Sequence, residues 1–367
     1  MPERFPVEHE HTAAVRVAGC AHEEVSEPVA PRADEVVLAV IRAAICGTDA
    51  AEWDHGPVLC RPGVVLGHEF VGRVVDVGAE VTGFRVGDRL VSGAGISCGR
   101  CRWCLLDRTN LCAEYRTLGL QVDGGLAEYV TTPAAICLAV PAGCDDDAAV
   151  MTQPLAVALH ALSRVAQGPD DSVAVIGVGG IGSFIVAGAA RRAVDGRVVA
   201  IDIDPERLST ASALGAGEVV DATGQELAKL LLDLTDGVGF DVVIEASGAA
   251  HAPAAATVGV RRGGRVLLVG LHAAPRELDL TAMIVREVDI FTSVAHICDT
   301  DIPAALQLLS ESNVAAVTAG PRIPLEELVE DGLRPLAEGR ATGKILIAPG
   351  ADGNHPEVEP RTMAGTT

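Results

Sequence analysis

The pattern of apolar and polar positions changes character about 150 residues into the chain. Before that point the apolar runs are short, rich in β-branched residues and separated by glycine-containing turns, which is typical of strands. The clearest runs are Val36–Ile45, Val64–Val77 and Arg85–Val91. We therefore expect residues 1–153 to form an irregular, partly closed β domain.

From about residue 152, helical and strand-like patterns alternate. Leu155–Val165 has the apolar spacing of a helix, and Pro205–Leu214 and Gln225–Leu234 continue this pattern. Strand-like runs occur near 173–176, 198–202, 217–220, 241–244, 265–269 and 289–294. This alternation predicts an α/β fold with a doubly wound parallel sheet. We expect a further helix at 302–311, a last strand at Lys344–Ile347, and a disordered polar tail at 351–367.

Length and composition restrict the class of protein. A chain of 367 residues favours two domains, and a net charge of −22 argues against a nucleic-acid partner. The uncharged run Ser172–Ala190 approaches the length of a membrane span, but its β-rich start and its glycines favour a strand and a turn. Lysine occurs only at Lys229 and Lys344, which we interpret as genomic bias.

The N-terminal residues 1–16 are polar and contain no apolar signal core, so we expect a cytoplasmic protein. The chain nevertheless contains ten cysteines. In that compartment clustered cysteines are metal ligands or catalytic groups rather than disulfides.

A glycine-rich turn follows the first strand of the alternating region. Gly177, Gly179 and Gly182 form G-x-G-x-x-G, with Gly180 and Ile181 in the same turn. Such glycines permit a tight turn and a close approach of the backbone to a pyrophosphate at the N-terminus of a helix. The pattern predicts a dinucleotide site, although a tight βα turn alone also needs glycine.

An acid closes the next strand at the distance expected for this fingerprint. Asp202 lies 20 residues after Gly182, where it is expected to accept hydrogen bonds from the ribose hydroxyls and, together with Asp204, to repel a 2′-phosphate. We therefore expect NAD rather than NADP, with Arg207 along the adenine. The alternative for Asp202 is a helix cap before Pro205.

Four closely spaced cysteines predict one metal site. Cys98, Cys101, Cys104 and Cys112 give C-x2-C-x2-C-x7-C, and four thiolates select tetrahedral zinc. Because the protein supplies all four ligands, this zinc would be structural. An iron–sulfur cluster and unrelated thiols are the alternatives.

Several of these motifs, in this order, resemble the zinc-dependent medium-chain alcohol dehydrogenases, particularly the sorbitol, threonine and butanediol dehydrogenase branch. The resemblance extends over about residues 30–348. The matching pieces are CGTD at 46–49, GHE at 67–69, GD at 87–88, CGRCRWC at 98–104 with Cys112, DGGLAEYV at 123–130, QPLAVALHA at 153–161, IGVGGIG at 176–182 and EASG at 245–248.

The resemblance implies a fold and its boundaries. A GroES-like irregular β-barrel would occupy residues 1–153, a Rossmann NAD-binding domain residues 154–296, and the chain would return to the catalytic domain at 297–350. Val288–Ala295 would form an edge strand that pairs with its copy in a homodimer or homotetramer, although a monomer is also compatible with such a strand.

The resemblance also implies a catalytic zinc held by residues that are scattered along the chain. Cys46 and His68 would be ligands, Glu69 a ligand in some states, and Gln153 stands where this branch usually has Glu. A neutral amide there would make the zinc a stronger Lewis acid. Asp49 would orient the histidine. The chain would thus bind two zinc ions, one catalytic and one structural.

The implied reaction moves a hydride between NAD(H) and a secondary alcohol or ketone of the polyol or amino-alcohol type. Thr48 would pass the alcohol proton outward, and Val269 and Val294 would lie along the cofactor. Relatives carry a His two residues beyond the acid of the CGTD motif, but here that residue is Ala51. His55 is a candidate replacement, or a surface histidine.

Two other functions stay open. The missing relay histidine also suits an NAD(P)H-dependent reductase of a C=N or activated C=C bond. A non-catalytic homologue is the third possibility.

Overall fold

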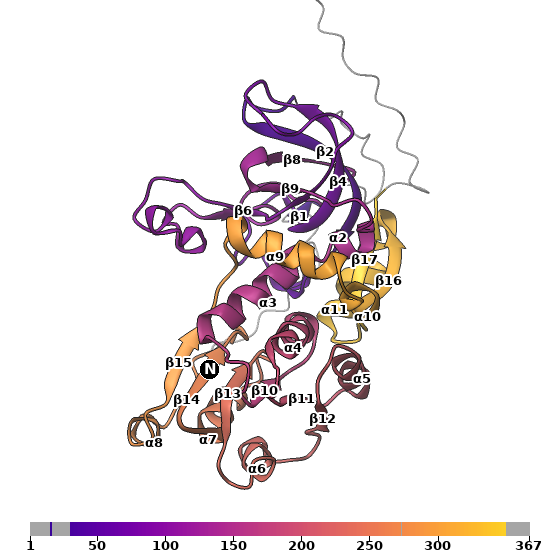
Figure 1. The fold of residues 1–367 in the computed structure, drawn as a ribbon. Coiled ribbons are helices and arrows are strands. Elements are labelled where there is room, and N and C mark those ends of the chain that lie inside the picture. The colour runs from indigo at the N-terminus through magenta and orange to yellow at the C-terminus, as the bar shows by residue number, and fades with distance from the viewer. Residues whose placement is uncertain (1–14, 17–29, 273, 350–367) are drawn as a thin grey trace, which may run out of the picture.

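The computed structural model describes residues 15–16, 30–272 and 274–349, so the expected tail at 351–367 lies outside the described residues. The chain forms two large sheets, connected by helices that lie between them (Figure 1).

The described strands are β1 (Val15–Arg16), β2 (Glu35–Ala44), β3 (Val64–Val65), β4 (Glu69–Val77), β5 (Arg89–Ser92), β6 (Gly95–Ile96), β7 (Arg116–Thr117), β8 (Tyr129–Pro133), β9 (Cys137–Ala139), β10 (Val173–Ile176), β11 (Val198–Asp202), β12 (Glu218–Asp221), β13 (Phe240–Glu245), β14 (Val260–Leu268), β15 (Asp289–Thr292), β16 (Ala319–Pro324) and β17 (Lys344–Ala348). The described α-helices are α1 (Gly47–His55), α2 (Asp146–Ala149), α3 (Thr152–Val165), α4 (Gly180–Arg192), α5 (Pro205–Ala213), α6 (Leu227–Asp233), α7 (Ala252–Gly259), α8 (Leu280–Ile284), α9 (Cys298–Ser310), α10 (Val314–Thr318) and α11 (Arg334–Ala337). Short helical turns are η2 (Cys104–Leu106), η3 (Thr109–Leu111), η4 (Ala134–Ile136), η5 (Leu325–Glu327) and η6 (Leu328–Leu333).

The alternating half of the chain forms a six-stranded parallel sheet. Its strand order is β12-β11-β10-β13-β14-β15, which is the doubly wound order in which the direction of winding reverses beside the first strand. Strands β10 and β11 are fully buried because helices cover both faces of the sheet. The predicted doubly wound sheet is therefore confirmed.

The other large sheet contains strands from both ends of the described chain. Its order is β16-β17-β2-β4-β5-β9, with β8 also paired to β2. Strand β17, near the end of the described chain, pairs with β2, near its beginning. The C-terminal part of the chain therefore returns to this sheet. The domain boundaries at 153, 296 and 350 stay a prediction.

Two predicted strands are shorter than the apolar pattern indicated. The run Val64–Val77 is divided into β3 and β4, because Gly67 takes a left-handed conformation (φ +98°) and an added Cβ there would lie 2.6 Å from Leu126. The run Arg85–Val91 forms a strand only from Arg89. The break at Gly67 matters for the site, because it places His68 and Glu69 at the start of β4.

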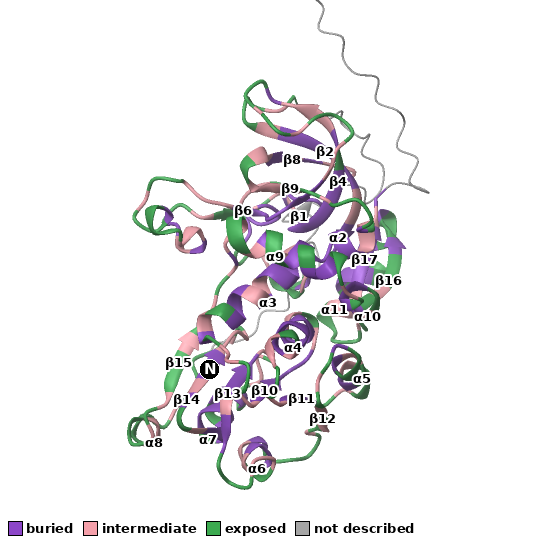
Figure 2. Cartoon of the chain, viewed as in Figure 1, coloured by how far each residue is buried: buried purple, intermediate pink, exposed green. Residues whose placement is uncertain are grey.

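Helices α3 and α9 connect the two sheets through one continuous core. This core includes Val71 and Val91 of the seven-stranded sheet, Leu155 and Leu162 of α3, and Leu306 of α9. Figure 2 shows the buried stretches of α3 and α9 lying between the sheets. The junction between the two halves is therefore packed by apolar side chains.

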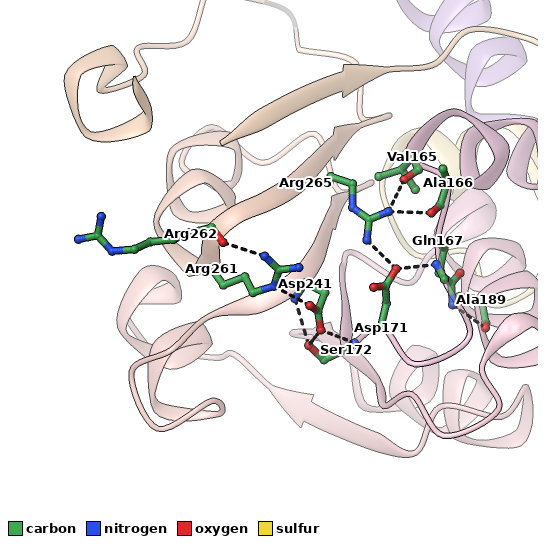
Figure 3. A network of polar contacts seen from close by, with 11 residues as sticks. Val165, Ala166, Gln167, Asp171, Ser172, Ala189, Asp241, Arg261, Arg262 and Arg265 are labelled. Atoms are coloured by element: carbon green, nitrogen blue, oxygen red, sulfur yellow. Dashed lines mark hydrogen bonds and ion pairs between the residues drawn. The ribbon is translucent and has the colours of Figure 1, made fainter. Parts of the chain in front are cut away.

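The C-terminal end of α3 is held by a network of charged groups at one edge of the parallel sheet (Figure 3). Arg265 of β14 donates to the carbonyls of Val165 and Ala166 at 3.0 and 2.7 Å, and to Asp171 at 2.7 Å. A cation here satisfies helix carbonyls that lack an intrahelical partner. In the same view Asp241 joins Ser172 to Arg261.

Among residues 30–272 and 274–349, no helix combines the length and apolar character needed to cross a bilayer. The uncharged run Ser172–Ala190 is divided between β10 and α4.

Candidate active site

Three residues that are distant in sequence form a candidate metal site. The Cys46 sulfur, a His68 ring nitrogen and a Glu69 carboxylate oxygen all lie within 4.8 Å of one another. Cys46 immediately precedes α1, where a thiolate is favoured by the helix N-terminus; His68 immediately precedes β4, and Glu69 begins it. This donor set of sulfur, nitrogen and oxygen suits zinc.

Asp49 fastens the two segments that carry these candidate ligands. It is fully buried, it accepts hydrogen bonds from the Cys46 N–H at 2.9 Å and the Gly67 N–H at 3.2 Å, and its Oδ1 lies 3.5 Å from His68 Nδ1. The bond to Cys46 is one half of a capping box at the start of α1, which explains why the sequence CGTD begins a helix.

The charges of this cluster support one another. Burial acts to lower the pKa of His68, but Asp49 and Cys46 outweigh it and raise that pKa well above its usual value. Burial acts to raise the pKa of Cys46, but the charge of His68 and its hydrogen bond lower it. Without metal, the cluster thus favours a Cys46 thiolate paired with a protonated His68, and metal binding would release the His68 proton.

Lys344 is a member of the cluster that sequence reasoning missed. Its amine lies 2.7 and 2.5 Å from the two carboxylate oxygens of Glu69, and its side chain is only 9% exposed. Its one signal in the sequence was the scarcity of lysine, which we interpreted as genomic bias. In the structure Glu69 is therefore an ion-pair partner as well as a candidate ligand.

Of the other predicted catalytic residues, Thr48 lies beside this cluster, whereas His55 lies at the far end of α1. The Thr48 hydroxyl is 3.8 Å from the Cys46 sulfur. Gln153 lies half-buried in the first turn of α3, without a side-chain hydrogen bond to any described residue. His55 ends α1, roughly 13 Å from Cys46 at 1.5 Å per residue, and its side chain is 78% exposed beside Asp54. A role of His55 in proton transfer stays a prediction, and the exposed position of its side chain does not support that role.

The four closely spaced cysteines form a second candidate metal site. Their sulfur atoms all lie within 4.8 Å of one another. The N–H groups of Cys98 and Glu114 donate to the Cys112 sulfur at 3.2 and 3.3 Å, and the N–H of Cys104 heads the contacts that lower the pKa of Cys101 to about 6. Four sulfurs at this separation fit one tetrahedral zinc.

The glycine-rich turn has the shape expected at a pyrophosphate site. An added Cβ at Gly177 (φ +82°) would lie 2.5 Å from Ser247, and one at Gly182 would lie 1.9 Å from the Gly177 carbonyl oxygen. At Gly180, in contrast, an added Cβ would meet open space. The turn therefore packs closely on its inner side and leaves room at the N-terminus of α4.

Asp202 lies directly beside this turn. One carboxylate oxygen accepts the Val178 N–H at 2.8 Å, and the other accepts the N–H groups of Ile203 and Asp204 at 2.8 and 3.1 Å. Two carboxylate oxygens offer about four acceptor sites, so one is left for a ligand. The helix cap before Pro205 is made by Asp204 instead. Arg207 lies 3.6 Å from Asp204 and 4.0 Å from Asp202.

A buried polar network crosses the junction at Val294, one of the last two predicted cofactor residues; the other, Val269, packs partly buried against the core. The Asn110 amide donates to the Val294 carbonyl at 3.0 Å and to His160 Nε2 at 3.2 Å. The opposite ring nitrogen of His160 then donates to Asp301 at 2.9 Å. Sequence reasoning missed this network, although His160 lies within the matched motif QPLAVALHA.

Comparison with known proteins supports the same interpretation. Residues 32–142 match the alcohol dehydrogenase GroES-like domain, and residues 180–311 match the zinc-binding dehydrogenase family. The chain is 36% identical to a sorbitol dehydrogenase of Halalkalibacterium halodurans, over 81% of this chain and 87% of that protein. It is 37% identical to an L-threonine 3-dehydrogenase of Photobacterium profundum, over 69% and 74% of the two chains.

A solved structure also has the same fold. The alcohol dehydrogenase TADH from Thermus sp. ATN1 superimposes with a TM-score of 0.81 at 31% identity, covering 89% of this chain and 95% of that one. The predicted combination of a GroES-like and a Rossmann domain is thereby confirmed. The chain belongs to the zinc-dependent medium-chain alcohol dehydrogenase family and is an oxidoreductase.

Proposed function

We propose that the chain oxidises a secondary alcohol of the polyol or amino-alcohol type to a ketone, or catalyses the reverse reduction, with NAD(H) as the hydride carrier. The observation that carries this proposal is the cluster of Cys46, His68 and Glu69 beside the Thr48 hydroxyl. The sorbitol and threonine dehydrogenases among its relatives support this class of substrate.

Each residue of the cluster has a distinct role in the proposal. Cys46 and His68, with Glu69 or Gln153, would hold a zinc ion, which would supply a Lewis acid that lowers the pKa of an alcohol hydroxyl. Asp49 fixes the orientation of the His68 ring. Thr48 would receive the hydroxyl proton, and a bound nicotinamide would supply the acceptor for the hydride of the carbon that carries the hydroxyl.

We propose NAD as the preferred cofactor because Asp202 is nearly buried at the end of β11 and keeps one acceptor site free. This carboxylate suits a ribose hydroxyl, whereas a 2′-phosphate would meet both Asp202 and Asp204. Arg207 is held by the same two acids, which leaves it less available to a phosphate.

A second candidate function has one observation in its favour. Ala51 is exposed and carries no group that could continue a proton path beyond Thr48. Hydride transfer to an iminium carbon would not need that path, because it gives a neutral amine without a further proton. Incubation with NADH and matched ketone and imine substrates, followed by product analysis, separates the two reactions.

The proposed function is tested by metal analysis and by NADH absorbance with a panel of secondary alcohols and either NAD or NADP. We expect two zinc ions per chain, turnover with NAD, and a much smaller kcat/KM with NADP. Cys46→Ser should lose one zinc ion and the activity, whereas Cys144→Ser, a buried cysteine outside both clusters, should keep both. One zinc ion per chain with no turnover would instead indicate a non-catalytic homologue.

A further inference from the structure

The four-cysteine segment, residues 98–112, carries a buried polar residue that contacts the other half of the chain. Asn110 lies in η3, two residues before Cys112, and is 6% exposed. The Cys112 N–H donates to the Thr109 carbonyl at 3.1 Å, which closes the turn around Asn110. The position of the Asn110 amide is therefore set by the same short turn that presents the Cys112 sulfur.

The Asn110 amide faces two acceptors on the far side of the junction. They are the Val294 carbonyl at 3.0 Å and His160 Nε2 at 3.2 Å. His160 Nδ1 lies 2.9 Å from the Asp301 carboxylate, which accepts its proton and so leaves Nε2 as an acceptor. Since both neighbours accept, the NH2 group of Asn110 is the end of the amide that faces them. Asn110 thus ties the four-cysteine segment to α3 and to the backbone that follows β15.

That backbone contains a residue in an unfavourable conformation. Ala295 has a left-handed φ of +51°, which costs free energy in a residue other than glycine and persists only where its surroundings hold it. Asn110 holds the Val294 carbonyl on one side, and Asp301 accepts the Ile297 N–H at 2.7 Å on the other. In the conformation held in this way, Val294 remains 57% exposed.

The exposed Val294 side chain lies at the end of the sheet where a dinucleotide is expected. Ligands of doubly wound sheets bind outside the carboxyl ends of the strands, and a dinucleotide extends over both halves of the sheet. Asp202 ends β11 in one half, where the proposed function places the adenosine ribose. The nicotinamide half would then lie toward β13, β14 and β15, and Val294 follows the last residue of β15 by two positions.

We propose that Asn110 is a positioning residue through which the four-cysteine segment fixes the backbone at Val294 beside the nicotinamide half of the cofactor. Zinc on the four sulfurs would hold the turn that carries Asn110, because metal binding by such a segment is coupled to its folding. The adenine half is independent of this contact, since Asp202 is bound by the N–H groups of Val178, Ile203 and Asp204. This inference rests on the proposed function, because it assumes that the cofactor is NAD(H).

Binding of NADH and of ADP tests the proposal, because ADP carries the adenine half without the nicotinamide nucleoside. In Asn110→Ala the Kd of NADH should rise about 5- to 30-fold, as expected for one or two lost hydrogen bonds in a buried site, while the Kd of ADP should change less than about 2-fold. Asn110→Ser, whose hydroxyl is too short to reach both acceptors, should behave alike and serves if the alanine variant does not fold. Thr109→Ala, in the same turn, should leave both constants unchanged.

Cys98→Ser tests the part played by the metal. This variant should contain one zinc ion fewer than the wild type by elemental analysis, and its Kd for NADH should rise by a factor similar to that of Asn110→Ala. Its Kd for ADP should stay at the wild-type value. Because both changes would release the same segment, adding Asn110→Ala to Cys98→Ser should weaken NADH binding little further.

The remaining outcomes overturn the proposal in distinguishable ways. An equal loss of affinity for NADH and ADP in Asn110→Ala means that the network only supports the fold. An unchanged Kd for NADH in Asn110→Ala, or in a Cys98→Ser protein that has lost zinc, removes the link between the four-cysteine segment and the cofactor. The wild type that binds NADH and oxidises an alcohol upholds the proposed function in each of these cases, whereas a wild type that does neither overturns both.

Discussion

The ion pair between Lys344 and Glu69 sets the charge beside the candidate zinc ligands. Cys46 as a thiolate, Glu69 and Asp49 are three acidic groups in one buried cluster, and Lys344 offsets one of them. A divalent ion balances the other two. Gln153 adds no charge, so the cluster with its metal is neutral, whereas a glutamate at position 153 would leave an excess negative charge. In electrostatic terms, this balance suits the neutral amide at position 153, where the resemblance leads us to expect a glutamate.

We expect Lys344→Met to lower the unfolding free energy of the zinc-free protein by about 3–5 kcal/mol, because it leaves a buried carboxylate without its partner. Glu69→Gln in the same chain should recover part of that loss, so the two changes should not be additive in a double-mutant cycle. Urea unfolding of the four proteins measures this coupling. Lys229→Met, at an exposed helix pair with Asp233, should leave stability nearly unchanged. Strictly additive losses would show that Lys344 and Glu69 do not act on each other.

Among the elements, α3 connects the candidate site to the far edge of the parallel sheet. Its first turn carries Gln153, and its last carbonyls are bound by Arg265 (Figure 3). Leu155 and Leu162 bury the face between these ends in the core shared by both sheets. The orientation of α3 therefore depends on contacts at both ends and along one face.

Arg265→Ala should lower the unfolding free energy by about 1–2 kcal/mol, since it removes charged hydrogen bonds from two helix carbonyls and from Asp171 in a site that solvent partly reaches. The melting temperature compared with wild type measures this effect. Arg262→Ala is the matched control, because that exposed side chain reaches one carbonyl, of Val285, at 3.2 Å. An equal decrease in melting temperature in both variants would show that the lost stability comes from removing any arginine, and not from the hydrogen bonds of Arg265 to the end of α3.

Elements with a strong local signal were predictable, whereas contacts between distant segments were not. Periodicity indicated Leu155–Val165 and the strands of the parallel sheet, and glycine spacing indicated the turn at Gly177–Gly182. The apolar run Val64–Val77 hid the left-handed turn at Gly67, because composition does not report backbone angles. The partnership of Lys344 with Glu69 joins residues 275 positions apart, so no local pattern could indicate it.

At the scale of the whole molecule, the six-stranded sheet ends in an exposed edge. Strand β15 is the last strand of that sheet, and Asp289, Ile290 and Thr292 are exposed. Exposed apolar residues of α8, Ile284 among them, precede this edge in the chain. Unprotected edges of this kind favour pairing with another strand. We therefore propose that two copies pair along β15, within a homodimer or a homotetramer.

Ile290→Lys should convert that assembly to a smaller species, because a charge at the edge opposes strand pairing. Light scattering coupled to size-exclusion chromatography gives the mass of each species directly. Val194→Lys is the control, since Val194 is 77% exposed and lies far along the chain from β15. A wild type that elutes as a monomer, or an Ile290→Lys variant with the wild-type mass, would rule out assembly through this edge.

The burial of Lys344 also has a practical consequence for chemical modification. Only two side-chain amines exist in the chain, and Lys344 is 9% exposed within its ion pair, whereas Lys229 is 71% exposed on α6. Of these two side chains, a dye or cross-linker that reacts with amines would therefore modify Lys229. Figure 1 shows α6 at the opposite end of the molecule from β2 and β4, whose ends adjoin the candidate metal ligands. A single label or surface tether at Lys229 would leave those ligands unmodified and present every molecule in the same orientation.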